Sequence, residues 1–175
     1  VKEERGNKGA AMTTFLSLPG RYCVLMPNSN RGGGISRKIT NYADRKRLKA
    51  IINDFDLPEN SAIIVRTAGS KRTKTEIKRD YTYLSNLWNE IRNKTLKSEA
   101  PALIHEEGSL IRRTIRDIYT NDIDNIIVEG DNGYKIAKEQ MKMLVPSHAK
   151  KVSKFTEDTH LFQKFKIEEQ LEMMH

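Results

Sequence analysis

Arg66 and Thr67 are two neighbouring side chains that could together bind a phosphate group. They follow a short apolar run and precede Ala68 and Gly69, whose small size would let a ligand approach the backbone. A guanidinium fork beside a hydroxyl suits the several acceptor oxygens of a terminal phosphate, and Arg37 could add positive charge. An Arg-Thr pair at the end of a strand is usually structural, so both roles stay open on these residues alone.

Signatures of catalysis are mostly absent from the rest of the chain. The histidines do not share the spacing of zinc ligands, which favours surface or hydrogen-bonded roles for them. They are His105, His148, His160 and His175. Cys23 stands inside an apolar run, which favours a buried thiol over a nucleophile, and a single cysteine excludes an intramolecular disulfide.

Asp122 and Asp124, with Asp131 nearby, form the only plausible carboxylate cluster of the sequence. Two-metal phosphodiester chemistry needs carboxylates that converge on ions about 4 Å apart, and these residues flank an expected strand. A turn rich in Asp and Asn is the more common explanation of such a pattern. The sequence therefore favours a turn and leaves a metal site as the alternative.

Hydrophobic periodicity predicts the elements that position these residues. Residues 10–18 and 21–26 are expected to pair as a hairpin across a Pro-Gly turn, followed by a glycine-rich loop over 27–34. A helix is expected from 40 or 41 to 53, a buried strand over 61–66 and a long helix over 74–97. After residue 100 the expected elements are strands over 103–105, 126–128 and 152–155 and helices over 108–119, 133–145 and 167–174. This alternation is typical of an α/β layer fold, and a composition shift near 99–101 suggests a domain boundary.

The net charge of +8 is concentrated in the first hundred residues. Such a basic half suggests a polyanion as partner, with nucleic acid the default candidate, although a solvated surface would also explain it. The sequence contains no apolar run that approaches the ~20 residues of a membrane-spanning helix, and no secretory signal. A reducing cytoplasmic location fits the single cysteine. Because the chain begins with Val1 rather than Met, we expect it to be a piece of a longer protein.

Several motifs follow one another along the chain in a fixed order. They are residues 2–10 (KEERGNKGA), 21–22 and 24–28 (RY and VLMPN), 33–37 (GGISR) and 65–69 (VRTAG), and Trp88, 104–107 (IHEE) and 115–117 (IRD) fit the same pattern. Together they resemble the bacterial ribonuclease E/G family over nearly the whole chain. Four ordered motifs make coincidence improbable.

The resemblance implies an endoribonuclease of RNA processing and decay, acting on messenger and ribosomal RNA. Such an enzyme cleaves single-stranded, A/U-rich RNA and prefers a 5′-monophosphate end. Residues 1–14 would be the tail of an OB-type RNA-binding barrel, 15–111 the 5′-sensor and 112–175 part of a ribonuclease H-like subdomain. The expected fold is a mixed α+β and α/β one: a small sensor domain of short strands and two helices, followed by an incomplete ribonuclease H-like α/β subdomain.

The same resemblance assigns roles to individual residues of this chain. Arg66 and Thr67 would grip the terminal phosphate, and Val24 would meet the first base. The full set expected at the 5′-phosphate is Arg66, Thr67, Gly20, Val24 and Arg37, and the residues expected to contact RNA in the barrel are Lys8, Lys2 and Arg5.

The family's catalytic machinery is expected to lie outside this chain. The aspartates that hold Mg²⁺, and the zinc-linking cysteine pair that helps to assemble a tetramer, belong to a subdomain downstream. We therefore expect no catalytic residue, metal, cofactor or tetramer here, and no RNA cleavage by this chain alone. The expected partner is single-stranded RNA with a 5′-monophosphate. The alternative is a non-enzymatic, basic RNA-binding or scaffold module without end preference.

Overall fold

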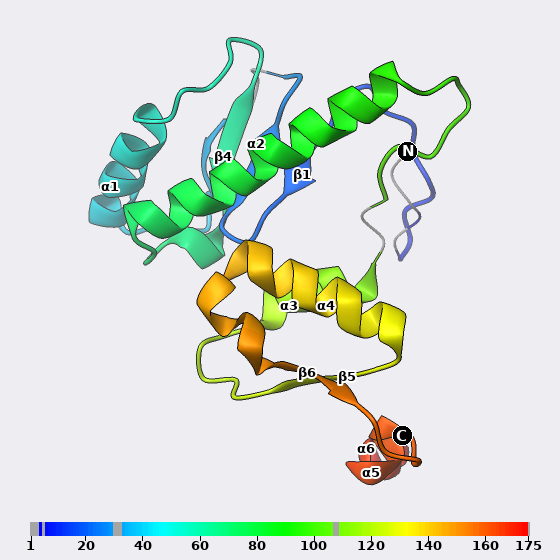
Figure 1. Ribbon diagram of the computed structural model, residues 1–175. Helices are drawn as coiled ribbons and strands as arrows, with labels where there is room; N and C mark the ends of the chain where they lie inside the picture. Colours follow the sequence, from blue (N-terminus) through cyan, green and yellow to red (C-terminus); the bar gives the residue numbers. More distant parts are fainter. Residues whose placement is uncertain (1–3, 5, 30–32, 107–108, 175) are drawn as a thin grey trace. The chain divides into compact units, whose positions relative to one another are not determined.

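The computed structural model describes residues 4, 6–29, 33–106 and 109–174 and divides the chain into two compact units (Figure 1). The first unit comprises Val1–His105 and the second Glu106–His175. Both units combine helices with short strands, so the expected mixed fold class is confirmed. Within the described parts of the chain, no helix combines the length and the apolar character that crossing a membrane requires.

The first unit is built on a four-stranded sheet. In spatial order its strands are β1 (Leu18–Pro19), β2 (Cys23–Met26), β4 (Ala62–Val65) and β3 (Gly34–Ile35). Strand β2 is antiparallel to β1 and β4, whereas β3 runs parallel to β4. A parallel pair needs a crossover connection, and helix α1 (Tyr42–Asn53) supplies it between β3 and β4.

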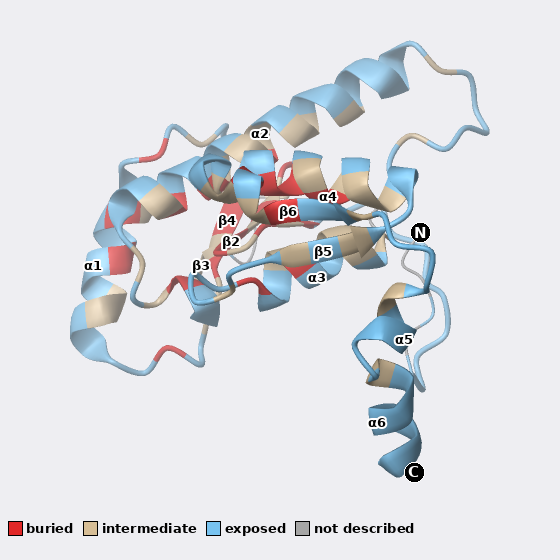
Figure 2. Ribbon diagram, turned by 60° about the horizontal axis from the view of Figure 1, so that its bottom comes forward, coloured by how far each residue is buried: buried red, intermediate tan, exposed pale blue. Residues whose placement is uncertain are grey.

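One face of this sheet carries the core of the first unit. Cys23 and Leu25 of β2 are buried, as are Ile63 and Val65 of β4, and Figure 2 shows buried positions in both strands. They pack with Leu48 and Ile51 of α1 and with Ile77 and Leu84 of α2 (Lys74–Leu96) in a single cluster. The opposite face carries a row of Pro19, Val24, Ile64 and Gly34, one from each strand, all of them partly exposed. Both helices therefore cover the same face.

Local sequence signals explain where the two helices begin. The Asn41 side chain accepts a hydrogen bond from the Asp44 N–H at 3.0 Å and caps α1. At the start of α2, Thr73 and Glu76 form a capping box in which each side chain accepts from the other's backbone N–H. These caps therefore determine the residues at which α1 and α2 begin, and both helices cover the sheet.

The second unit is a small α/β arrangement. Its elements in chain order are α3 (Leu110–Ile118), β5 (Ile126–Glu129), α4 (Asp131–Leu144), the 3-10 helix η2 (Pro146–Lys151), β6 (Val152–Phe155), α5 (Leu161–Lys164) and α6 (Ile167–Met173). Strands β5 and β6 are parallel and are connected through α4. The core of this unit is formed by buried side chains of α3, α4, η2 and β6 with Tyr119.

The structure confirms most of the predicted elements and corrects three. The strand expected over residues 10–18 is reduced to Leu18–Pro19, although its antiparallel pairing with β2 is confirmed. No strand forms over 103–105, where the described residues are irregular. The strand expected as buried at 126–128 is only half-buried, with every second residue exposed. Pairing with a single neighbour leaves β5 without the cover that a central strand would have.

Candidate functional site

The sequence-predicted phosphate residues gather at one edge of the four-stranded sheet. Because β3 and β4 are parallel, both strands end at this edge, and antiparallel β2 begins there. Two backbone hydrogen bonds extend the pairing beyond the strands: the Arg66 N–H donates to the Tyr22 carbonyl at 2.7 Å, and the Ser36 N–H donates to the Val65 carbonyl at 2.9 Å. The Gly20 turn, Arg66 and the Arg37 segment are thereby brought together from three parts of the sequence.

Arg66 is held by the turn in front of β2. Its backbone is extended, and its guanidinium Nη1 donates to the Gly20 carbonyl oxygen at 2.5 Å. Thr67 begins the 3-10 helix η1 (Thr67–Gly69) and is exposed. The structure thus places the Arg66 head group beside the Gly20 backbone and leaves the adjacent Thr67 side chain at the surface.

Asp80 of α2, a residue that sequence analysis did not single out, organises the turn in front of β2. Its Oδ1 accepts from the Arg21 N–H at 3.0 Å, and its Oδ2 accepts from the N–H groups of Tyr22 and Cys23 at 2.7 and 2.8 Å. Only 5% of Asp80 is exposed. Burial raises the pKa of this carboxyl, while the backbone donors and the Arg66 charge act in the opposite direction.

Only glycine fits at position 20, because of this buried carboxylate. A Cβ at position 20 would lie 2.5 Å from Asp80 Oδ2 and 2.7 Å from Oδ1, so any larger residue would collide with the carboxylate. Gly69 is constrained in a similar way, because its Cβ would lie 2.8 Å from the Val65 side chain and 3.1 Å from the Tyr22 carbonyl. Gly69 therefore allows close packing inside the unit, which accounts for this glycine without a ligand.

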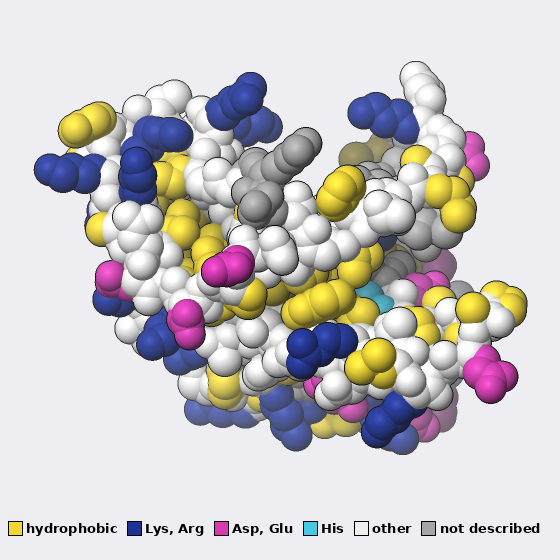
Figure 3. All heavy atoms as spheres, turned by 90° about the horizontal axis from the view of Figure 1, so that it is seen from above, with side chains coloured by type: hydrophobic (Ala, Val, Ile, Leu, Met, Phe, Trp, Pro, Cys, Tyr) yellow, Lys and Arg dark blue, Asp and Glu magenta, His cyan; other side chains and the backbone are white. Residues whose placement is uncertain are grey.

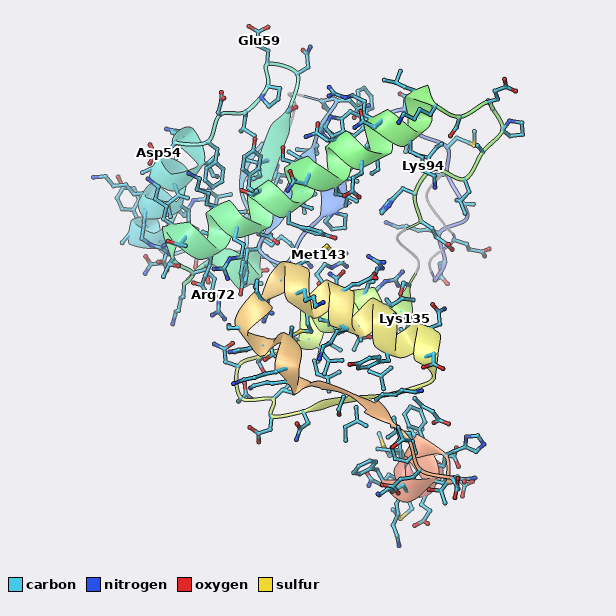
Figure 4. All side chains as sticks on the ribbon, in the orientation of Figure 1. Asp54, Glu59, Arg72, Lys94, Lys135 and Met143 are labelled. Atoms are coloured by element: carbon cyan, nitrogen blue, oxygen red, sulfur yellow. The ribbon has the colours of Figure 1, made fainter. Side chains whose placement is uncertain are left out.

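The turn that follows η1 is held by α1. Arg47 donates from Nη1 to the Arg72 carbonyl at 2.7 Å and from Nη2 to the Ser70 carbonyl. Arg72, at the N-terminal end of α2 (Figure 4), places its guanidinium 5.4 Å from the centre of the buried Tyr22 ring. Arg47 of α1 therefore fixes the backbone that follows Thr67, and Asp80 of α2 fixes the turn in front of β2.

The remaining predicted residues lie around this edge to different extents. Val24 is half-buried and lies opposite Ile64 on the more open face of the sheet. Arg37 is exposed, and its segment is held by Arg45, whose Nη1 donates to the carbonyls of Ser36 at 3.1 Å and Ile39 at 3.0 Å. Figure 3 shows several Lys and Arg side chains on the side of the first unit where α1 lies.

Of the three residues expected to contact RNA in the barrel, the structure describes only Lys8. Lys8 is exposed in the segment before β1, outside the hydrogen-bonded group described above. Lys2 and Arg5 lie outside the described residues.

The other candidate groups have structural roles. Asn121 and Asp122 lie in a turn, as expected. Asp131 pairs with Lys154 at 2.7 Å, and the described residues form no His, Cys, Asp or Glu cluster suited to a metal. The Cys23 thiol is fully buried, which raises its pKa, as expected of an inert cysteine. His148 hydrogen-bonds the Tyr119 hydroxyl at 2.7 Å.

Comparison with known proteins agrees with the motifs at this site. The model of the ribonuclease E/G family matches residues 17–175. Ribonuclease E of Haemophilus influenzae is 42% identical over 171 residues, and ribonuclease E of Escherichia coli K12 is 40% identical over 172. Each alignment covers 98% of this chain. Ribonuclease G of Escherichia coli K12 is 28% identical over 172 residues, again 98% of the chain.

The chain spans only a small part of these relatives. It covers 18% of the Haemophilus protein, 16% of the Escherichia coli ribonuclease E and 35% of the ribonuclease G. The family match nevertheless extends over most of the chain, from the strand before the Gly20 turn through both units. The chain therefore belongs to the ribonuclease E/G family.

Proposed function

We propose that the first unit binds the 5′-monophosphate end of single-stranded RNA, as the recognition part of an endoribonuclease of RNA processing and decay. The relatives that share most of this chain are named ribonuclease E or ribonuclease G, which supports an RNA-cleaving parent protein. The basic charge of the first half agrees with a polyanionic ligand.

The observation that carries this proposal is the position of the Arg66 guanidinium at the sheet edge. It lies against the Gly20 carbonyl, next in sequence to the exposed Thr67. A terminal monophosphate offers more negative charge and more free oxygens to such a pair than an internal phosphodiester, and charge-assisted bonds are roughly twice as strong as neutral ones. A 5′-hydroxyl end offers no anion at this position. The pair would therefore distinguish RNA ends by charge.

Val24 and Arg37 would extend recognition beyond the phosphate. Val24 and Ile64 lie side by side on the more open face of the sheet and offer an apolar surface to the first base. Arg37 follows β3, whose end is aligned with that of β4, and would add positive charge near the RNA backbone. Lys8 would contact RNA elsewhere, through a phosphate.

Hydrolysis would require groups that the described residues do not offer. They contain no cluster suited to Mg²⁺ or Zn²⁺, and Cys23 is buried and single in the chain. We place the magnesium-binding aspartates, the zinc-linking cysteines and the tetramer contacts in other parts of the longer family proteins. This chain supplies RNA binding, and a cytoplasmic site of action is part of the same proposal.

A binding experiment with matched RNA ends tests the function. The probe is a ten-nucleotide, A/U-rich RNA with a 3′ fluorophore and either a 5′-monophosphate or a 5′-hydroxyl, followed by fluorescence anisotropy. We expect tighter binding of the phosphorylated RNA, and loss of the difference in Arg66→Ala and Thr67→Val. Arg92→Ala, an exposed position near the other end of α2, removes the same charge and should keep the difference.

A basic module without end preference predicts a different result. Its affinity would fall steeply with salt and be equal for both RNA ends, because phosphate contacts along a strand carry no end information. Equal affinity of the folded chain for the two RNAs, measured at two salt concentrations, would contradict the 5′-end proposal.

A further inference from the structure

We propose that Asp80 is a positioning residue for the RNA end: it holds the turn over Gly20–Cys23 so that the Gly20 carbonyl aims the Arg66 guanidinium at the terminal phosphate. The inference rests on the proposed function of the first unit. Asp80 itself is buried and acts through the backbone and Arg66 rather than on the ligand.

The first link between Asp80 and the RNA end is a set of hydrogen bonds: one carboxylate accepts from three successive backbone N–H groups. Arg21, Tyr22 and Cys23 donate to Asp80 at 3.0, 2.7 and 2.8 Å. These donors lie where the chain passes from the Gly20 turn into β2, outside the pairing of β2 with β1. The carboxylate therefore supplies the acceptors that a neighbouring strand would otherwise provide, and it ties the turn to the rigid α2 helix.

The second step connects the turn to Arg66. The Gly20 N–H donates to the Cys23 carbonyl at 2.8 Å, which closes the turn, and the Gly20 carbonyl accepts from Arg66 Nη1 at 2.5 Å. The Arg66 charge also opposes the rise that burial causes in the pKa of Asp80, so the two groups interact electrostatically. A displaced Asp80 would therefore release both the backbone acceptor and the charge that orient the guanidinium.

The position of Asp80 in the sequence supports a role beyond packing. It lies on the buried face of α2 between Ile77 and Leu84, at the helical spacing where an apolar side chain would fill the core. Burying a carboxylate is costly unless it is fully hydrogen-bonded, and a well-packed apolar residue often gives equal or greater stability. Stability alone would favour an apolar residue at this position, so we infer that the aspartate is present because it sets the geometry of the turn.

The test compares Asp80→Asn with the matched control Asp54→Asn. Asparagine keeps the shape but replaces one acceptor oxygen by an N–H₂ group that faces a backbone donor. Asp54 is exposed at the end of α1 (Figure 4) and pairs with Lys74 at 2.6 Å. Both variants lose one negative charge in the first unit, so a general change in RNA attraction is the same for both.

The readout is the ratio of the two dissociation constants, for the 5′-hydroxyl and the 5′-monophosphate RNA described above, with the 175-residue chain. We expect Asp80→Asn to reduce this ratio by about tenfold, roughly the loss of one charge-assisted bond, while the affinity for 5′-hydroxyl RNA stays equal to that of Asp54→Asn. A merely structural role would weaken the binding of both RNAs together. Trp88 fluorescence, which reports the α2 core, verifies that the first unit is folded.

The outcomes separate this inference from the function on which it rests. If the unmodified chain does not distinguish the RNA ends, the proposed function fails. If it does, and folded Asp80→Asn distinguishes them equally well, the positioning role alone is refuted. Should Asp80→Asn not fold, the same question is answered in the unmodified chain by NMR: phosphorylated RNA should shift the amide signals of Tyr22 and Cys23 and the Asp80 carboxyl signal, and unchanged signals would overturn the inference.

Discussion

Replacing Gly20 by alanine should measure how tightly the Gly20 turn is fitted to Asp80. The added Cβ would lie 2.5 Å from Asp80 Oδ2, whereas ordinary van der Waals contact begins at 3.4 Å, so one of the two groups must move by about 0.9 Å. A shift of that size would break the bonds of Oδ2 to the Tyr22 and Cys23 N–H groups, now 2.7 and 2.8 Å long. Overpacking costs about 1–3 kcal/mol and each buried donor left unpaired costs about as much. We expect the free energy of unfolding of the first unit to fall by at least about 3 kcal/mol, the sum of the lower ends of these ranges.

Urea unfolding followed by Trp88 fluorescence measures this change, because Trp88 packs against the core that contains α2. With a slope of about 2 kcal/mol per molar urea, the midpoint should fall by at least about 1.5 M. Gly9→Ala is the control, since a Cβ there meets no atom within 4 Å, and it should change the free energy of unfolding by less than about 0.5 kcal/mol.

A double-mutant cycle isolates the contact between the two residues. In an Asp80→Ala background the carboxyl group is gone, so adding Gly20→Ala should cost less than about 0.5 kcal/mol. A cost of Gly20→Ala as small as that of Gly9→Ala, or a cost that is the same with and without Asp80, would refute the close fit between Gly20 and Asp80.

Three further perturbations test other parts of the structure. Leu84→Ala should lower the free energy of unfolding of the first unit by about 2–5 kcal/mol, because Leu84 is fully buried; an effect below 1 kcal/mol in urea unfolding would contradict the assigned core. Thr73→Ala removes the cap of α2 and should cost about 1 kcal/mol in the same assay, and an unchanged midpoint would show that the capping box is not needed. Glu129 has a lowered pKa because it accepts hydrogen bonds from the Leu161 N–H and from His160, and pairing with Glu129 at 2.9 Å raises the pKa of His160. The contact therefore persists between the two pKa values and is lost as pH rises through that of His160 or falls through that of Glu129. An NMR titration should place the His160 midpoint above 6.5, and Glu129→Gln should lower it; a midpoint that does not move would refute the pairing.

The sequence predicted the elements that depend on local signals. The long helix α2 was expected over 74–97 and is found at Lys74–Leu96, because its apolar periodicity and its capping residues are all local. The strand expected over 10–18 failed because its Thr, Phe and Leu composition favours a strand, whereas only Leu18 and Pro19 find a partner in β2. Pairing depends on the partner strand, which composition does not report.

Asp80 shows why the candidate site could be predicted only in part. Arg66 and Thr67 stood out because their types suit a phosphate, and family motifs added Gly20. Asp80 lies 14 residues after Arg66, in a helix that the sequence predicts from its apolar residues, and its residue type alone does not connect it to a phosphate site. The available signal was an acidic residue on the buried face of a helix, between Ile77 and Leu84, where a charge requires an explanation.

The hydrogen bonds that order Arg66 affect how many contacts a site would need in order to distinguish RNA ends. A free arginine side chain carries ~2 kcal/mol of rotamer entropy, which a ligand must overcome when it orders the guanidinium. Here the Gly20 carbonyl already holds that group, Asp80 holds the turn that carries this carbonyl, and Arg47 holds the backbone after Thr67. A phosphate would then meet a donor that is ordered before binding, so little of its interaction energy is lost to ordering. Because a 5′-hydroxyl end would gain nothing from this order, rigidity at Arg66 would widen the proposed difference between the two RNA ends.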